Sequence, residues 1–131
     1  MKRLIAALML FAPVACSDSP TGPSSLVVED IVVGTGATAA TGDTLTVHYV
    51  GRLQNGSQFE SSYDLNSPYT FRVGAGQVIA GWDQGIPGMK VGGKRRLTIP
   101  PSLAYGNQQV GSIPPNSTLV FDVELLSIAG K

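Results

Sequence analysis

Cysteine and histidine are nearly missing from this chain of 131 residues, since each occurs once, as Cys16 and His48. A single cysteine cannot form an internal disulfide, and one residue of each kind cannot supply Cys/His catalysis or a zinc site with several ligands. Nucleotide-binding motifs are lacking too. No Walker sequence occurs, and Ile79 stands where a GxGxxG motif beginning at Gly74 needs its last glycine. The sequence therefore predicts no metal ion and no cofactor.

The charge and composition of the chain indicate one folded domain without a nucleic-acid partner. Nine basic and nine acidic residues balance, whereas a nucleic-acid-binding domain typically carries an excess of positive charge. Hydrophobic residues make up 43% of the chain, which is enough for a buried core, and the length fits a single domain. Sixteen glycines and nine prolines favour short strands and turns over long helices.

A long hydrophobic run is also lacking at the N-terminus, where the apolar segment extends only from Leu4 to Ala15. This run of about twelve residues is too short for a membrane-spanning helix, which needs ~20. Lys2 and Arg3 precede it, and a short apolar segment after a positively charged start is typical of a signal peptide. We therefore expect residues 1–15 to be a signal peptide and the protein to be exported.

The apolar run ends in Pro-Val-Ala-Cys at residues 13–16, which resembles a bacterial lipobox. In a lipobox the signal peptidase cuts before a cysteine whose thiol receives a lipid. Pro13 departs from the usual aliphatic residue, so the alternative is an ordinary signal peptide, an incidental cysteine and a soluble secreted protein. We expect lipidation of Cys16 and a flexible Ser/Pro/Gly-rich linker over 16–25. The folded domain, 26–131, would then be anchored to a membrane and face the periplasm or the cell exterior.

Alternating and β-branched segments predict several short strands. Thr44 to Leu53 alternates apolar and polar residues, and Asn55-Gly56 follows as a strong hairpin signal. The other expected strands are 26–33, 57–61, 70–73, 94–99 and 118–128. One short helix is expected over Val78 to Ile86, where the apolar residues share one side. The prediction is an α+β fold, in which a five- to six-stranded antiparallel sheet curves around one short helix.

Four ordered segments of the chain resemble the signatures of FKBP-type peptidyl-prolyl isomerases. They are VHYVG, NG and FESSY within 47–63, GQVIAGWDQG at 76–85, MKVGGKR, IP and LAYG within 89–106, and IPPNSTLVFDVELL at 113–126. The resemblance covers about residues 26–128 without large insertions. It implies an enzyme that accelerates rotation about X–Pro bonds in protein substrates and assists the folding of exported proteins.

The resemblance also implies a proline-binding pocket. Carried over by position, the catalytic residues are Tyr49, Phe59, Glu60, Trp82, Tyr105 and Phe121, and the substrate-binding residues are Tyr69, Val78, Ile79 and Ile113. Trp82 would be the floor beneath the prolyl ring, although for any one of these aromatic residues alone an ordinary core position is the alternative. The N–H of Ile79 and the hydroxyl of Tyr105 would donate hydrogen bonds to ligand carbonyls. The Glu60 carboxylate would lie near the carbonyl of the rotating bond.

Three positions depart from the family pattern. Glu60 stands where the family usually has Asp, so its carboxylate lies one methylene further out. Leu65 replaces a frequent Arg near the pocket rim, so a polar network there is expected to be missing. The loop from Asn107 to Ser112 is one residue shorter than in well-known eukaryotic members, and because that loop contacts substrate side chains, substrate preferences are expected to differ.

Two polar features have plain structural interpretations. His48 should face away from the pocket if Tyr49 faces into it, so a surface or locally hydrogen-bonded histidine is expected. Lys94, Arg95 and Arg96 form a short basic cluster on a predicted strand. We expect them on a solvated face of the sheet rather than in a phosphate site.

The expected partners are proline-containing protein substrates and, as inhibitors, macrolides, and we expect the protein to be a monomer. The alternative function is a binding module or chaperone that holds exposed hydrophobic or proline-containing segments without catalysis. Larger family members combine the two roles through an inserted flap domain. The stretch from Val91 to Tyr105 leaves no room for such an insertion, which favours catalysis.

Overall fold

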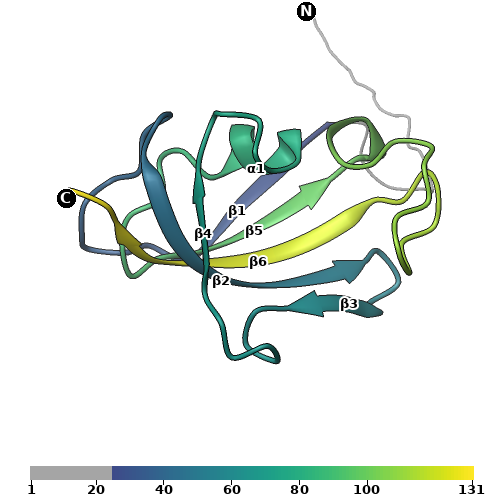
Figure 1. Cartoon of the computed structure of the whole chain (residues 1–131), viewed down its shortest axis with the longest axis horizontal. Coiled ribbons are helices and arrows are strands. Elements are labelled where there is room, and N and C mark those ends of the chain that lie inside the picture. Colours follow the sequence, from purple (N-terminus) through teal and green to yellow (C-terminus); the bar gives the residue numbers. More distant parts are fainter. Residues whose placement is uncertain (1–24) are drawn as a thin grey trace, which may run out of the picture.

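The computed structural model describes residues 25–131 (Figure 1). The predicted signal peptide, Cys16 and nearly all of the predicted linker lie outside the described residues. Within residues 25–131, no helix is long and apolar enough to cross a membrane.

Six strands and one short α-helix make up this part of the chain. They are β1 (Val27–Val32), β2 (Thr44–Leu53), β3 (Gln58–Ser61), β4 (Tyr69–Arg72), α1 (Ala80–Gly85), β5 (Lys94–Ile99) and β6 (Leu119–Ile128). A 3₁₀ turn at Pro101–Leu103 follows β5. The predicted α+β architecture is confirmed, and each predicted strand lies within a residue or two of its observed position.

All strands belong to one antiparallel sheet in the order β1-β5-β6-β2-β3. β4 pairs with the first half of β2, along Thr44 to Val47, and β3 pairs with the second half. β2 and β6 are the longest strands, at ten residues each. Figure 1 shows them running through the middle of the sheet, with α1 against one face. The sheet therefore has one covered face and one open face.

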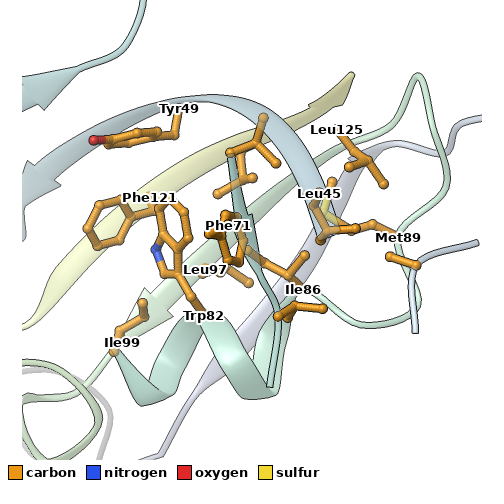
Figure 2. Packing of buried hydrophobic residues seen from close by; sticks show 14 of the residues in the cluster. Leu45, Tyr49, Phe71, Trp82, Ile86, Met89, Leu97, Ile99, Phe121 and Leu125 are labelled. Carbon is orange, nitrogen blue, oxygen red and sulfur yellow. The ribbon is translucent and has the colours of Figure 1, made fainter. Parts of the chain in front are cut away.

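The covered face carries the hydrophobic core. In β2 the buried side chains are Leu45, Val47 and Tyr49, which follow the two-residue period of a half-buried strand. β6 repeats the pattern from Leu119 to Leu125. Figure 2 shows these strands and α1 directing their apolar side chains toward one another. The core therefore lies between the sheet and the helix.

The helix is shorter than the sequence predicted. It begins at Ala80, because Ile79 has an extended backbone with φ −61° and ψ 153°. The carbonyl of Ile79 accepts hydrogen bonds from the N–H groups of Trp82 and Asp83, which starts the first turn. The prediction that Val78 and Ile79 lie on the apolar side of the helix is therefore wrong. They lie half-buried in the segment that leads into it.

Two glycines let α1 approach β5 closely. A Cβ atom added at Gly81 would lie 2.5 Å from Cγ2 of Ile99, and one added at Gly85 would lie 2.8 Å from Cδ2 of Leu97. Any larger residue would push the helix away from the sheet. This contact fixes the depth at which Trp82, on the same helix, enters the core.

Candidate active site

A cavity of about 420 Å³ lies where α1, the middle strands and the loop after β5 meet. Its walls are formed by Tyr49, Glu60, Tyr69, Gly76, Gln77, Val78, Ile79, Trp82, Tyr105 and Phe121. Eight of these ten were expected to line a proline pocket, and they come from β2, β3, β4, β6, α1 and two loops. The fold thus brings together side chains that are distant in the sequence.

Trp82 and its aromatic neighbours form the floor of the cavity. The Trp82 ring is 4% exposed. It packs edge-to-face against Tyr49 at a centroid distance of 5.0 Å and against Phe121 at 5.3 Å. Phe71 supports it at 5.4 Å. Such geometries are the preferred arrangements of aromatic rings, and Figure 2 shows the rings gathered at one end of the buried cluster.

The indole N–H of Trp82 is buried and finds no hydrogen-bond acceptor among residues 25–131. Buried polar groups are normally paired, and an unpaired donor costs ~1–3 kcal/mol. Four aromatic rings pack around Trp82, and none of them offers a carbonyl that could accept from this N–H. The cavity floor is therefore apolar, although it contains an indole nitrogen. Position 82 therefore suits a flat aromatic ring, even though the tryptophan ring brings a buried polar nitrogen with it.

A bulge in β3 explains why two consecutive residues face the same side of the sheet. Gly51 pairs with Glu60, but the next residue, Arg52, pairs with Gln58, so Phe59 is the extra residue. Consecutive side chains of a regular strand alternate between faces. Here Glu60 lines the cavity while Phe59 packs edge-to-face against Phe121 at 5.6 Å.

Two of the predicted pocket residues do not line the cavity. Phe59 stands behind Phe121, where its ring closes the space over Gly51. Ile113 is buried, and a bridge with Val110 folds its loop back on itself. The structure therefore places Ile113 in the core and partly buried Phe59 against it, and neither lines this cavity.

The rim of the cavity carries three phenols near one carboxylate. Burial, reinforced by the interaction of its hydroxyl with Glu60, raises the pKa of Tyr49 well above its ordinary value. Burial also raises the pKa of Tyr105, and the negative charge of Glu60 adds to this shift, followed by Tyr69. Since both shifts favour the protonated phenol, Tyr49 and Tyr105 are neutral hydrogen-bond donors at physiological pH.

The sequence interpretation missed Gly76 and Gln77, which complete the wall before Val78. Gly76 has a φ of +75° and makes the turn into this segment. The Asp83 carboxylate accepts hydrogen bonds from the backbone N–H groups of Gly74, at 2.7 Å, and Gly76, at 3.2 Å. The Gly-Ala-Gly run, considered above only as a failed nucleotide motif, was the signal for this turn.

The polar groups on the open face pair locally, as expected. The Nδ1 atom of His48 lies 2.8 Å from the Ser62 hydroxyl, and its ring stacks on Tyr63. Arg96 forms an ion pair with Asp122 on this face. Arg95 instead lies on the covered side, where its 11% exposed side chain pairs with Asp30 and donates hydrogen bonds to the carbonyls of Gly85 and Pro87 at the end of α1. The locally hydrogen-bonded histidine is therefore confirmed, whereas the prediction that the whole basic cluster lies on a solvated face is wrong for Arg95, which packs at the end of the helix.

The comparisons with known proteins agree with this geometry. Residues 36–126 match the family described as FKBP-type peptidyl-prolyl cis-trans isomerase. An FK506-binding protein of Neisseria meningitidis serogroup A is 52% identical over 105 residues, which cover 79% of this chain and 96% of the relative. FK506-binding protein 4 of Dictyostelium discoideum is 56% identical over 110 residues, or 83% of this chain and 30% of the relative. This chain therefore spans less than a third of that longer protein.

Solved structures show the same fold. The crystal structure of AtFKBP13 superposes with a TM-score of 0.76 at 50% identity, covering 82% of this chain and 95% of that one. FkpA from Escherichia coli superposes with a TM-score of 0.73 at 46% identity, covering 82% of this chain and 50% of that one. The matched segment contains every residue of the cavity wall. The chain belongs to the FKBP-type peptidyl-prolyl cis-trans isomerase family.

Proposed function

We propose that this chain catalyses cis/trans rotation about X–Pro bonds in other proteins and binds the prolyl ring in the cavity above Trp82. The observation that carries the proposal is the form of this site. It has an apolar aromatic floor, with the polar groups Glu60 and Tyr105 among its lining residues. Tyr49, Phe59, Glu60, Trp82, Tyr105 and Phe121 are the proposed catalytic set, in which Phe59 acts by supporting Phe121. Tyr69, Val78 and Ile79 complete the proposed binding wall, with Ile113 behind it.

This reaction suits a site without a nucleophile. The X–Pro amide is planar because resonance gives its C–N bond double-bond character, and the rotation barrier is ~18–20 kcal/mol. The uncatalysed exchange takes roughly tens to hundreds of seconds. No covalent bond breaks, so the protein needs only to stabilise the twisted amide relative to the planar one. An acceleration of about 10⁴ corresponds to ~5.5 kcal/mol.

The apolar floor supplies part of this difference. The planar amide is more charge-separated than the twisted amide, and water stabilises that separation. Transfer of the amide from water to the aromatic surface of Trp82 and Phe121 therefore weakens the ground state more than the transition state. Hydrogen bonds that hold the peptide in a turn favour the twisted form further.

Two donors on the cavity wall are suited to hold the peptide. The N–H of Ile79 has no acceptor among the described residues, because the helix begins only after it. The neutral Tyr105 hydroxyl is the second donor. We assign both to carbonyl groups of the bound substrate.

Catalysis, rather than passive binding alone, is favoured by the short connection after β5. β5 ends at Ile99, the 3₁₀ turn at Pro101–Leu103 follows, and Tyr105 already lies on the cavity wall. No chaperone flap is inserted between β5 and the cavity.

The fragment 26–131, which contains the whole sheet and core, should accelerate exchange of an X–Pro tetrapeptide. A catalytic efficiency equal to that of a heat-denatured control would refute the enzymatic function and favour the binding module.

Macrolide binding follows from the same cavity. The two relatives compared above carry the name FK506-binding protein. We propose that FK506-like macrolides occupy the prolyl site of this chain. Because Trp82 is the only tryptophan, binding should quench the protein's tryptophan fluorescence and compete with the peptide substrate. Unchanged fluorescence and no competition at micromolar ligand would contradict the assignment of the cavity.

We also propose that the protein is exported and that a lipid on Cys16 holds the domain as a monomer on the outer side of a bacterial membrane. The proposal rests on the charged start, the short apolar run and the cysteine that follows it. Its substrates would be exported proteins that fold there. Mass spectrometry of the mature chain should show cleavage before Cys16 and a diacylglycerol mass. An unmodified cysteine would favour the soluble secreted form.

A further inference from the structure

A second depression borders the prolyl cavity on the side of β3. Its walls are Gln58, Phe59, Glu60, Ser61, Asp64 and Leu65. We call it the acidic groove. Glu60 is the one residue that lines both the acidic groove and the prolyl cavity. The two spaces therefore adjoin at Glu60.

The acidic groove combines two carboxylates with apolar walls. Neither Glu60 nor Asp64 forms an ion pair with a described residue, and no Lys or Arg lines the groove. The side-chain amide of Gln58 donates a 2.7 Å hydrogen bond to Asp64 Oδ2, which holds this carboxylate beside β3. Leu65 is 66% exposed. The groove thus offers negative charge and uncovered apolar surface together.

The basic side chain on the strand that pairs with β3 is engaged elsewhere. Arg52 pairs with Gln58 in the β-ladder, but its guanidinium lies 3.4 Å from Asp122, a residue of β6. Leu65, which also lines the groove, carries no charge. The negative charges of Glu60 and Asp64 are therefore available to a positively charged ligand.

We propose that the acidic groove binds the positively charged side chain, Lys or Arg, of a substrate residue next to the proline. The inference rests on the proposed function, because it places the prolyl ring in the neighbouring cavity. Consecutive Cα atoms are at most ~3.8 Å apart, so a residue adjacent to the proline stays beside Glu60 when the ring occupies the cavity, and a Lys or Arg side chain is long enough to enter the groove from there.

The chemistry of the groove favours a long basic side chain over other types. Lys and Arg bury an aliphatic stem along apolar surface while their charged end stays at the water boundary. Phe59 and Leu65 provide that surface, and Glu60 and Asp64 provide the counter-charge. An acidic side chain would be repelled by both carboxylates. A neutral polar side chain would gain neither contact.

The test compares peptides that differ only beside the proline. One series places Lys, Gln or Glu before the proline, and a second places them after it. In at least one series, we expect kcat/KM for Lys to exceed that for Gln by about two- to fivefold at low salt, which is the range that exposed ion pairs support. The ratio should fall toward one at ~1 M salt, where the screening length is ~3 Å, and Glu should give the lowest value.

Two variants that each remove one negative charge show whether the preference for Lys arises in the acidic groove. Asp64→Asn should lower the Lys-to-Gln ratio toward one. Glu29→Gln, on exposed β1 at the opposite edge of the sheet, should leave the ratio unchanged. Equal kcat/KM for the three residues in both series, or a ratio that survives Asp64→Asn, would overturn the groove's role. Failure to accelerate any peptide would instead remove the proposed isomerase function and the groove's role with it.

Discussion

Glu60 holds a position that could be mistaken for that of a general acid or base. It lines the cavity where the substrate is proposed to bind, and it interacts with two phenols, Tyr49 and Tyr105. Amide rotation requires no proton transfer, and an ionised carboxylate does not attract a carbonyl oxygen. Glu60 therefore orders the rim by accepting a hydrogen bond from a neighbouring phenol.

The variant Glu60→Gln should lower kcat/KM less than about tenfold. Loss of a hydrogen bond costs ~0.5–1.5 kcal/mol, or up to ~3 when it is charge-assisted, and 1.36 kcal/mol corresponds to about one decade in rate. Glu60→Asp, which restores the usual residue of the family, should leave activity similar or slightly higher. Both are measured by peptide exchange across pH. A thousandfold loss in a folded Glu60→Gln variant, together with the disappearance of a limb of the pH profile, would show acid–base catalysis.

Trp82 should be replaceable by another aromatic ring at a smaller cost than by alanine. Trp82→Ala opens a cavity in the core and should destabilise folding by ~3–5 kcal/mol, with a larger loss of activity than Glu60→Gln. Trp82→Phe keeps a ring between Tyr49 and Phe121 and removes the unpaired N–H, whose burial costs ~1–3 kcal/mol. Urea unfolding followed by circular dichroism measures both. Equal destabilisation by the two variants would mean that the nitrogen is satisfied.

Most wall residues could be predicted from family motifs, but the direction of each side chain could not. The β3 bulge turns Phe59 and Glu60 to one side, which no alternating pattern indicates. Ile113 is carried inward by the closure of its own loop. Gly76 forms part of the wall through its positive-φ turn, and the Gln77 side chain accepts a hydrogen bond from the Arg72 N–H at 2.9 Å, a tertiary contact that no sequence pattern indicates.

Among the elements, the sheet could be predicted and the helix start could not. Strand periodicity over Thr44 to Leu53 is decided by burial on one face, and the observed strand has the same bounds. The helix start depends on the extended backbone of Ile79 and on the Asp83 hydrogen bonds to the preceding loop. Both are tertiary features, and a window of apolar residues does not contain them. Val78 and Ile79, which precede the helix instead of beginning it, line the candidate site.

The contact between α1 and β5 should be sensitive to a single methyl group. Gly81→Ala places a Cβ 2.5 Å from Cγ2 of buried Ile99. Overpacking costs ~1–3 kcal/mol against a gain of ~1 in helix propensity, so the variant should lose up to about 2 kcal/mol in net stability. Ile99→Ala removes all three contacting atoms. In that background Gly81→Ala should become neutral or stabilising, as a double-mutant cycle would measure. Additive effects would show that helix and strand adjust freely.

Over the whole molecule, the two faces of the sheet have different roles. The covered face holds the aromatic cluster and the cavity. The open face carries the ion pairs of Arg52 and Arg96 with Asp122, and the hydrogen bond from the Tyr63 hydroxyl to Glu124 at 2.6 Å. These exposed pairs contribute little individually. The hydrogen bond of Tyr63, whose phenol titrates in the alkaline range, does however make the stability of the fold depend on pH there.

The folded protein should lose stability between about pH 10 and 12, and Tyr63 should account for part of the loss. Burial, followed by the hydrogen bond to Glu124, raises the pKa of Tyr63 to about 12 from an ordinary value of 10.0. Above pH 10 the unfolded chain releases this proton while the folded chain retains it, so folding stability falls as pH rises. Lysine ion pairs also weaken there, so the comparison requires Tyr63→Phe. Urea unfolding should show this variant less stable than the parent at pH 8, with the difference shrinking toward pH 12. A difference that stays constant across this range would mean that Tyr63 ionises equally in both states.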